Sequence, residues 1–196
     1  SGISSAISGM SVNGFYGLRV EDEEISLNVP DVVKVVAVYE ALDATSVTLD
    51  KLSFTSGLNL DTQSVLGEKI TGASSGAVGQ IVTRSSSTEV EFVYLNSNKF
   101  AVNETVRFEE SSIKGAISVI TKGNYTDKTY EYNLDKGQRE QYYDYSRIVR
   151  KPGASVPSRR LLVIHNHYTV PNNDTGDVYT VDSYDNERYK DDLPVL

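Results

Sequence analysis

Two segments of the chain match each other at a constant spacing, and this repeat restricts the possible folds more than any other feature. The first copy begins at residue 67 and the second at residue 103, and the two copies align without a gap. Two copies are too few for a solenoid, which normally needs about three stacked repeats. We therefore expect two similar hairpins that face each other in one small barrel or sandwich. The matched positions are Gly67-Glu68-Lys69-Ile70 with Asn103-Glu104-Thr105-Val106, then Ser75 with Ser111, Gly79 with Gly115 and Ile81 with Ile117.

The sequence outside the repeat also predicts strands. Between the two copies, EVEFVYL alternates strictly, which places Val90, Phe92 and Tyr94 on one face. Residues 32–38 form a β-branched run, as expected for a central strand covered on both faces. TYEYNL, RLLVIHNHYTV and VYTVDSY are further predicted strands. The 13 Tyr, against 5 Phe and no Trp, also suit half-buried pleated surfaces.

One short helix is predicted in the Tyr-rich last third. The segment DKGQREQYYDYSRI begins at Asp135, whose carboxylate would cap the first N–H groups. On such a helix Arg139 and Tyr143 share a face, so the guanidinium would lie against the ring. Pro152, Gly153 and Pro157 predict a loop before the next strand. The predicted fold is mainly β: a small barrel-like module, a β-sandwich-like layer and this helix.

These elements suggest three parts of the chain. Residues 1–18 are Gly- and Ser-rich and are predicted to be a flexible lead-in. Residues 59–122 hold the repeat and are predicted to form a barrel-like module, inserted into a β-rich, Tyr-containing domain of residues 19–58 and 123–196. The chain begins at Ser1 without an initiator Met, so we expect a fragment of a larger protein.

Composition argues against several classes of function. The chain has no Cys, which excludes disulfides and thiolate metal sites. Its formal charge of −8 argues against nucleic-acid binding, and no apolar run approaches the roughly 20 residues of a membrane span. It contains no G-x-S-x-G motif and no Lys-Ser/Thr after its Gly-rich turn. We therefore predict no enzymatic activity and no cofactor.

The only two histidines leave two alternatives open. His165 and His167 share a face of a predicted strand, as a pair of metal ligands would. A metal site would need further ligands, and Asp174 or Asp177 is the nearest carboxylate. The alternative is that both rings pack beside neighbouring tyrosines. We favour packing and predict no metal site.

Five basic residues stand out in an otherwise acidic chain. No Asp or Glu occurs from Tyr145 through Asn173. One interpretation is a positive patch that docks an acidic neighbour, such as the Glu21–Glu24 cluster of another subunit. The other is ordinary solvated loop charge. The five residues are Arg147, Arg150, Lys151, Arg159 and Arg160.

The order of motifs in this region resembles an uncharacterised domain of virion structural proteins in tailed bacteriophages, especially those that infect marine cyanobacteria. The resemblance covers about residues 124–190. Its most specific part is Gln138-Arg139 followed by Tyr142-Tyr143-Asp144, ahead of a basic segment, Lys151-Pro152-Gly153 and an apolar strand. Residues 66–77 also resemble a small β-module of such virion proteins.

The resemblance implies a structural component of a phage tail, baseplate or tail fibre. Its partners would be other virion proteins and further copies of itself. The alternative is a receptor- or glycan-binding adhesin on the same particle, with Asn172-Asn173-Asp174 as a candidate sugar or calcium turn. The candidate interface residues are Arg139, Tyr142, Tyr143, Arg147, Arg150, Lys151, Arg159 and Arg160.

Overall fold

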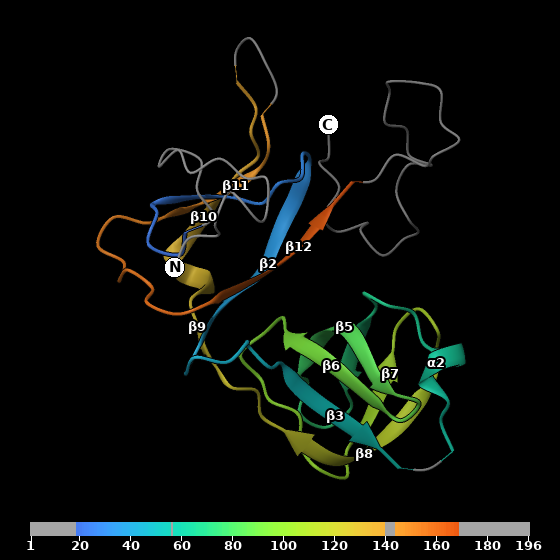
Figure 1. Cartoon of the computed structure of the whole chain (residues 1–196). Helices are drawn as coiled ribbons and strands as arrows, with labels where there is room; N and C mark the ends of the chain where they lie inside the picture. Colours follow the sequence, from blue (N-terminus) through green and yellow to red (C-terminus); the bar gives the residue numbers. More distant parts are fainter. Residues whose placement is uncertain (1–18, 56, 140–143, 169–196) are drawn as a thin grey trace, which may run out of the picture. The chain divides into compact units, whose positions relative to one another are not determined.

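The computed structural model describes residues 19–55, 57–139 and 144–168. The chain divides into two compact units, one of Ser1–Val47 with Tyr125–Leu196 and one of Thr48–Asn124. Almost all regular structure in the described part is antiparallel strand, which confirms the mainly-β prediction (Figure 1). No helix in these ranges is long and apolar enough to cross a membrane.

The unit Thr48–Asn124 is a closed barrel with the strand order β3-β6-β5-β4-β7-β8. Strand β3 closes it by pairing with both β6 and β8. The sequence had placed this strand in the other domain, so the barrel begins earlier than residue 59. The elements are β3 (Asp50–Phe54), helix α2 (Leu60–Gln63), β4 (Lys69–Gly72), β5 (Val78–Ser86), β6 (Glu89–Tyr94), β7 (Thr105–Phe108) and β8 (Lys114–Thr121).

The barrel interior is filled by the inward-facing apolar residues of every strand. Glycines make room for two of its rings. A Cβ on Gly79 would lie 2.7 Å from Phe92 Cδ2, and one on Gly115 would lie 2.9 Å from Phe54 Cδ1. The buried members of this core are Leu52, Phe54, Leu60, Ile70, Ala77, Ile81, Val90, Phe92, Phe100, Val106, Phe108 and Ile117.

The two repeats are related by an approximate two-fold axis through the barrel. Strands β4 and β7 pair with Thr71 opposite Arg107 at the centre, and the flanking register pairs are equivalent to each other. The pair Ile81–Phe92 between β5 and β6 likewise corresponds to Ile117–Phe54 between β8 and β3. Strands β4-β5-β6 thus correspond to β7-β8-β3. The last strand of the second repeat is supplied from the start of the unit.

The described part of the other unit contains two three-stranded sheets, with orders β1-β11-β10 and β12-β2-β9. Strand β2 is central in its sheet, as the valine run predicted. Both sheets contribute to one core, formed by Ile25, Val38, Tyr132 and Ile148 with Leu161 and Val163 against them. The strands are β1 (Glu24–Ser26), β2 (Val32–Ala41), β9 (Tyr125–Asp127), β10 (Tyr132–Asp135), β11 (Arg147–Arg150) and β12 (Leu161–His167).

The helix predicted from Asp135 is wrong. Asp135 is instead the last residue of β10, which pairs antiparallel with β11. The carboxylate accepts a hydrogen bond from the Gly137 N–H at 2.9 Å, and Gly137 has φ +78°, which a right-handed helix does not allow. The α-helix of the described part is α2, and the start of TYEYNL forms a 3₁₀ turn, η1 (Thr129–Glu131).

Several predictions concern residues outside the described part of the chain. These are the lead-in of residues 1–18, the strand VYTVDSY and the Asn172-Asn173-Asp174 turn. Tyr142 and Tyr143, and with them the stacking of Arg139 on a tyrosine ring, also lie outside the described residues.

Candidate functional site

The first notable site in the barrel is a buried carboxylate that binds the opposite repeat. Glu68 is fully buried at the start of β4. Its Oε1 accepts the N–H of Val65 at 2.6 Å, and its Oε2 accepts the N–H groups of Glu110 and Ser111 at 3.2 and 3.0 Å. The Ser111 hydroxyl adds a further bond to Oε2 at 3.0 Å. Glu68 therefore holds the β7–β8 turn of the other repeat, from the end of the neighbouring strand β4.

Glu104 makes the same contacts in the opposite direction. Its Oε1 accepts the Ala101 N–H at 2.6 Å, and its Oε2 accepts the N–H groups of Ser74 and Ser75 at 3.3 and 3.1 Å. Burial raises the pKa of Glu104, but the hydrogen bonds from Ala101 and Ser75 outweigh it and leave the pKa below its ordinary value. Each repeat thus holds the turn of the other.

Sequence reasoning missed these two glutamates as functional residues, although it had the signal. Both members of each pair, Glu68 with Ser111 and Glu104 with Ser75, occur at matched repeat positions. A buried carboxylate needs several donors, and N–H groups of a tight turn together with a serine hydroxyl supply them. The reciprocal direction of the contacts follows only from the closed barrel.

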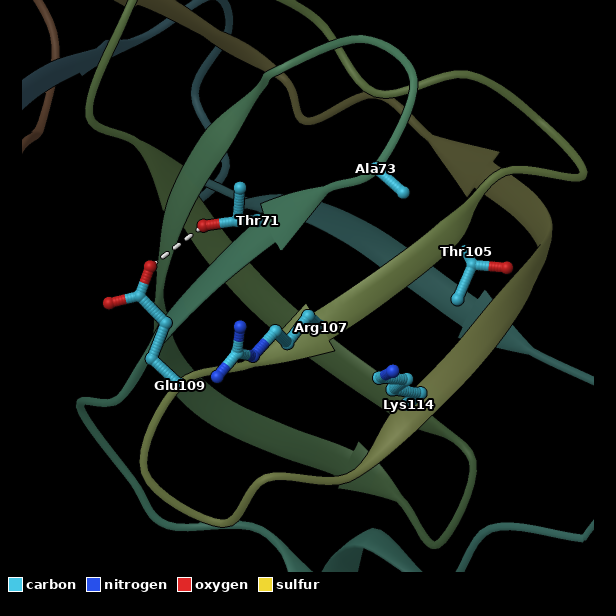
Figure 2. A pocket seen from close by; sticks show the side chains of 6 residues that line it. All are labelled: Thr71, Ala73, Thr105, Arg107, Glu109 and Lys114. Carbon is cyan, nitrogen blue, oxygen red and sulfur yellow. Dashed lines mark hydrogen bonds between the residues drawn. The ribbon is translucent and has the colours of Figure 1, made fainter.

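An open groove lies on the outer face of the barrel, over the central strand pair, and has a volume of about 540 Å³. Figure 2 shows Arg107 between Glu109 on one side and Lys114 on the other. Arg107 and Lys114 are opposite each other in the register of β7 and β8. The Thr71 hydroxyl donates to Glu109 Oε1 at 2.8 Å. The groove is lined by Thr71, Ala73, Thr105, Arg107, Glu109 and Lys114.

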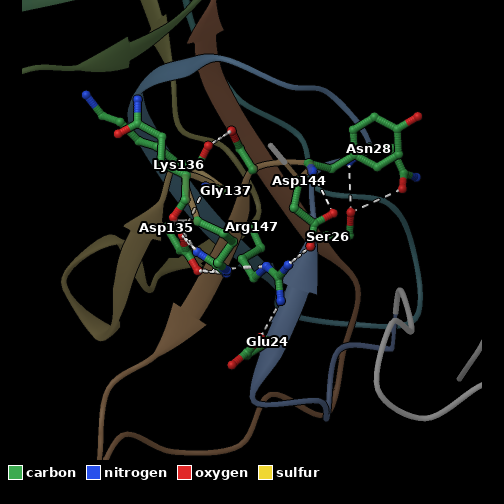
Figure 3. A network of polar contacts seen from close by, with 12 residues as sticks. Glu24, Ser26, Asn28, Asp135, Lys136, Gly137, Asp144 and Arg147 are labelled. Atoms are coloured by element: carbon green, nitrogen blue, oxygen red, sulfur yellow. Dashed lines mark hydrogen bonds and ion pairs between the residues drawn. The ribbon is translucent and has the colours of Figure 1, made fainter. Parts of the chain in front are cut away.

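The candidate interface residues near β10 and β11 form a charge network (Figure 3). Arg147 is at its centre, with only 12% of its side chain exposed. Its Nη1 donates to Glu24 Oε2 at 2.8 Å, its Nη2 donates to Asp144, and its Nε lies 3.9 Å from Asp135 Oδ2. The network ties β1, β10 and the segment before β11 together.

Arg139 completes this network through a bidentate contact with Asp135. Its Nη1 and Nη2 donate to Oδ1 and Oδ2 at 3.0 and 2.7 Å. These hydrogen bonds lower the pKa of Asp135 to about 2, against the opposing effect of burial, with help from the Gly137 N–H and the charge of Arg147. Asp135 is therefore fully ionised at neutral pH.

Three other members of the basic run contact their own chain. Arg150 Nη1 donates to the carbonyls of Glu21 and Asp22, at 3.2 and 3.1 Å. Lys151 Nζ donates to a main-chain carbonyl of η1 at 2.8 Å, and Arg160 Nη1 donates to the Ser46 hydroxyl at 3.0 Å. Arg159 is exposed. The acidic segment 21–24 is thus contacted by Arg147 and Arg150 of the same polypeptide.

The two histidines lie at the end of β12. Their ring centroids are 5.2 Å apart, with His165 partly buried and His167 exposed. Burial lowers the pKa of His165, and the charge of His167 adds to the effect. Within the described ranges, no group of three or more His, Asp or Glu side chains is placed to hold a metal ion. Asp174 and Asp177 lie beyond those ranges.

No protein-family model, no curated protein and no solved structure matches the chain. Its function is therefore inferred from its own residues.

Proposed function

We propose that the chain is a non-enzymatic structural component of a tailed-bacteriophage virion, located in the tail, baseplate or tail fibre. It supplies rigid surfaces to which other virion proteins and further copies of the chain attach. The proposal rests on the motif order of residues 124–190 and on the way this chain uses its buried charges.

The observation that carries the structural role is that every buried charged side chain of the described part ties chain segments together. Asp50 accepts the Gly123 N–H at 2.6 Å, which fixes the end of the barrel to its beginning. Glu68 and Glu104 each hold the turn of the other repeat, between the neighbouring strands β4 and β7. Lys128 donates to Glu131 and Ser155 at 2.9 and 2.6 Å. A buried charge is costly unless it is paired, so these groups favour one arrangement of the chain over looser alternatives.

Labelling of intact particles tests this proposal. An antibody raised against the purified chain would be applied to intact virions of the phage that encodes the chain, and a gold conjugate would then locate the antibody by electron microscopy. We expect gold on the tail, baseplate or fibres at regular positions. Absence of labelling, together with absence of peptides of the chain in mass spectra of the same particles, would contradict the proposal.

Receptor or glycan binding on the same particle is the second candidate function. The open groove beside Arg107 and Lys114 favours it for a negatively charged receptor or acidic glycan, because an exposed concave site with two cations suits such a ligand. A glycan array probed with the labelled chain separates the two candidates. Selective glycan binding that is lost in an Arg107→Thr variant would support the adhesin. An array without binding would leave the structural role as the remaining candidate.

A further inference from the structure

The outer groove of the barrel contains two cations without ionic partners. Arg107 and Lys114 are both exposed, and neither side chain makes a hydrogen bond or an ion pair with any other described residue. They lie directly opposite each other on neighbouring strands, an arrangement that destabilises a sheet when the charges are alike. An anion placed between them would remove that repulsion.

The approximate two-fold symmetry shows that the fold does not need these charges. The position equivalent to Arg107 in the first repeat is Thr71, and the position equivalent to Lys114 is Val78. Both repeats form the same strand pairs, although only one carries the cations. Barrel formation therefore does not explain the presence of the two basic residues.

The groove lining also contains one carboxylate. Glu109 is held by the Thr71 hydroxyl through Oε1, and its Oε2 remains available to a donor. Its equivalent in the first repeat is Ala73, so the fold does not require this carboxylate either. A ligand that fits must offer a negative charge to Arg107 and Lys114 and an N–H or O–H donor to Glu109.

We propose that this groove binds an acidic polypeptide segment of a partner protein. A carboxylate of the segment lies between Arg107 and Lys114, and a backbone N–H donates to Glu109. A bare inorganic anion is disfavoured because it offers no N–H or O–H donor to offset its repulsion by Glu109. A neutral sugar is disfavoured because it offers no charge to Arg107 and Lys114, and because none of the lining residues is aromatic, the usual platform for a sugar ring. This inference rests on the barrel alone and is independent of the virion assignment.

An NMR titration of the ¹⁵N-labelled full chain tests the site. The probe is an acetylated, amidated hexapeptide of alternating Glu and Asp. We expect saturable shifts of the Thr71, Thr105, Arg107 and Lys114 amides, with a Kd that weakens as salt is raised. Shifts elsewhere, or no shifts at peptide concentrations of about 5 mM, where binding of even millimolar Kd would be visible, would overturn the proposal.

Substitutions taken from the first repeat provide the variants, because the fold already accepts those residues at the equivalent positions. Arg107→Thr and Lys114→Val should each weaken peptide binding about tenfold and leave the rest of the spectrum unchanged. Lys122→Thr removes one charge from an exposed position outside the groove lining and should change the Kd less than about twofold. Equal losses of peptide affinity in all three variants would mean that binding depends only on the net charge of the chain, which would overturn the proposed site.

Two further ligands separate peptide recognition from other anion binding. Inorganic sulfate that shifts the same amides with equal affinity would mean an adventitious ion only. A carboxylate-bearing hexasaccharide that binds more tightly than the peptide would overturn the peptide assignment in favour of an acidic glycan. Binding of the peptide alone, lost in Arg107→Thr, supports the proposal.

Discussion

At the scale of single residues, Glu68 and Glu104 do the most to define the barrel. Each is a buried carboxylate with its oxygens surrounded by N–H and O–H donors, and each acts between repeats. The sequence gives the positions of both, but a Glu in a polar-looking turn motif gives no sign of burial. Burial depends on closure of the barrel, which brings residues 68 and 111 together.

Glu104→Gln should destabilise the barrel by about 1–3 kcal/mol. The amide keeps the size of the side chain but loses an acceptor oxygen, so the N–H groups of Ala101, Ser74 or Ser75 lose their partner on a buried side chain. Hydrogen exchange of the Ile117 amide measures the change within the barrel. Glu109→Gln is the matched control, because this exposed carboxylate makes one surface bond and should change stability by less than about 0.5 kcal/mol. Similar losses in both variants would contradict the role of burial.

At the scale of elements, the β10–β11 region shows where sequence reasoning failed. The spacing of Gln138, Arg139 and the tyrosines satisfies a helix, and Asp135 is a good capping residue. The same carboxylate instead closes a turn onto Gly137 and pairs with Arg139 at the end of a strand. Local spacing could not decide between these outcomes, because the choice also depends on Glu24, which contacts Arg147 from a distant part of the chain.

Gly137→Ala should weaken this sheet by more than about 2 kcal/mol. A Cβ would lie 2.1 Å from the Asp144 carbonyl oxygen, and the positive φ of Gly137 adds backbone strain. Urea titration followed through the NMR signal of buried Ile148 measures the loss. Gly153→Ala shares the positive φ, at +83°, but its Cβ would meet nothing within 4 Å, so it should cost only about 1–2 kcal/mol. Equal losses would mean that strain alone accounts for the effect.

The charge network should make the stability of the same sheet depend on pH in the acid range. The pKa of Asp135 is about 2 in the folded chain, below its ordinary value of 3.8. A lowered folded-state pKa stabilises the fold above about pH 4, and this contribution of at most about 2 kcal/mol disappears as the pH falls toward 2. Asp135→Asn keeps the turn bond from Gly137 but loses the charge.

Urea titrations at pH 7 and pH 3, again followed through Ile148, compare the two chains. Asp135→Asn should lose stability at pH 7 and show a smaller difference between the two pH values than the parent. Asp127→Asn alters an exposed carboxylate whose one partner among the described residues is Thr129, and it should leave the pH difference unchanged. A parent-like pH difference in Asp135→Asn would falsify the assigned role of this carboxylate.

At the scale of the whole molecule, the sequence predicted the β class and the repeat but placed the barrel boundary too late. Strand β3 carries neither the Gly-Glu motif nor the serine turn of the repeat. Its only signal is that KLSF at residues 51–54 has the same alternation as EVEF at residues 89–92. That likeness gains meaning only once β3 and β6 are known to be equivalent and paired.

A fragment of residues 48–124 should fold alone, because it holds all six strands and its ends meet. The Asn124 N–H donates to the Thr48 carbonyl at 3.1 Å. We expect a dispersed NMR spectrum that matches the barrel signals of the full chain. A fragment of residues 59–124, the boundary predicted from sequence, lacks β3 and should remain unfolded, since β6 and β8 would each lose a partner. Folding of the shorter fragment would contradict the requirement for closure.

Glu68 and Glu104 each bind the turn of the other repeat, and this reciprocal contact suggests how the barrel arose. Contacts in which each half holds the other by the same residues are what two identical chains make around a two-fold axis. Gene duplication and fusion of an ancestral homodimer would leave this pattern within one polypeptide. A later shift of the termini would explain why the second half borrows its last strand from the beginning.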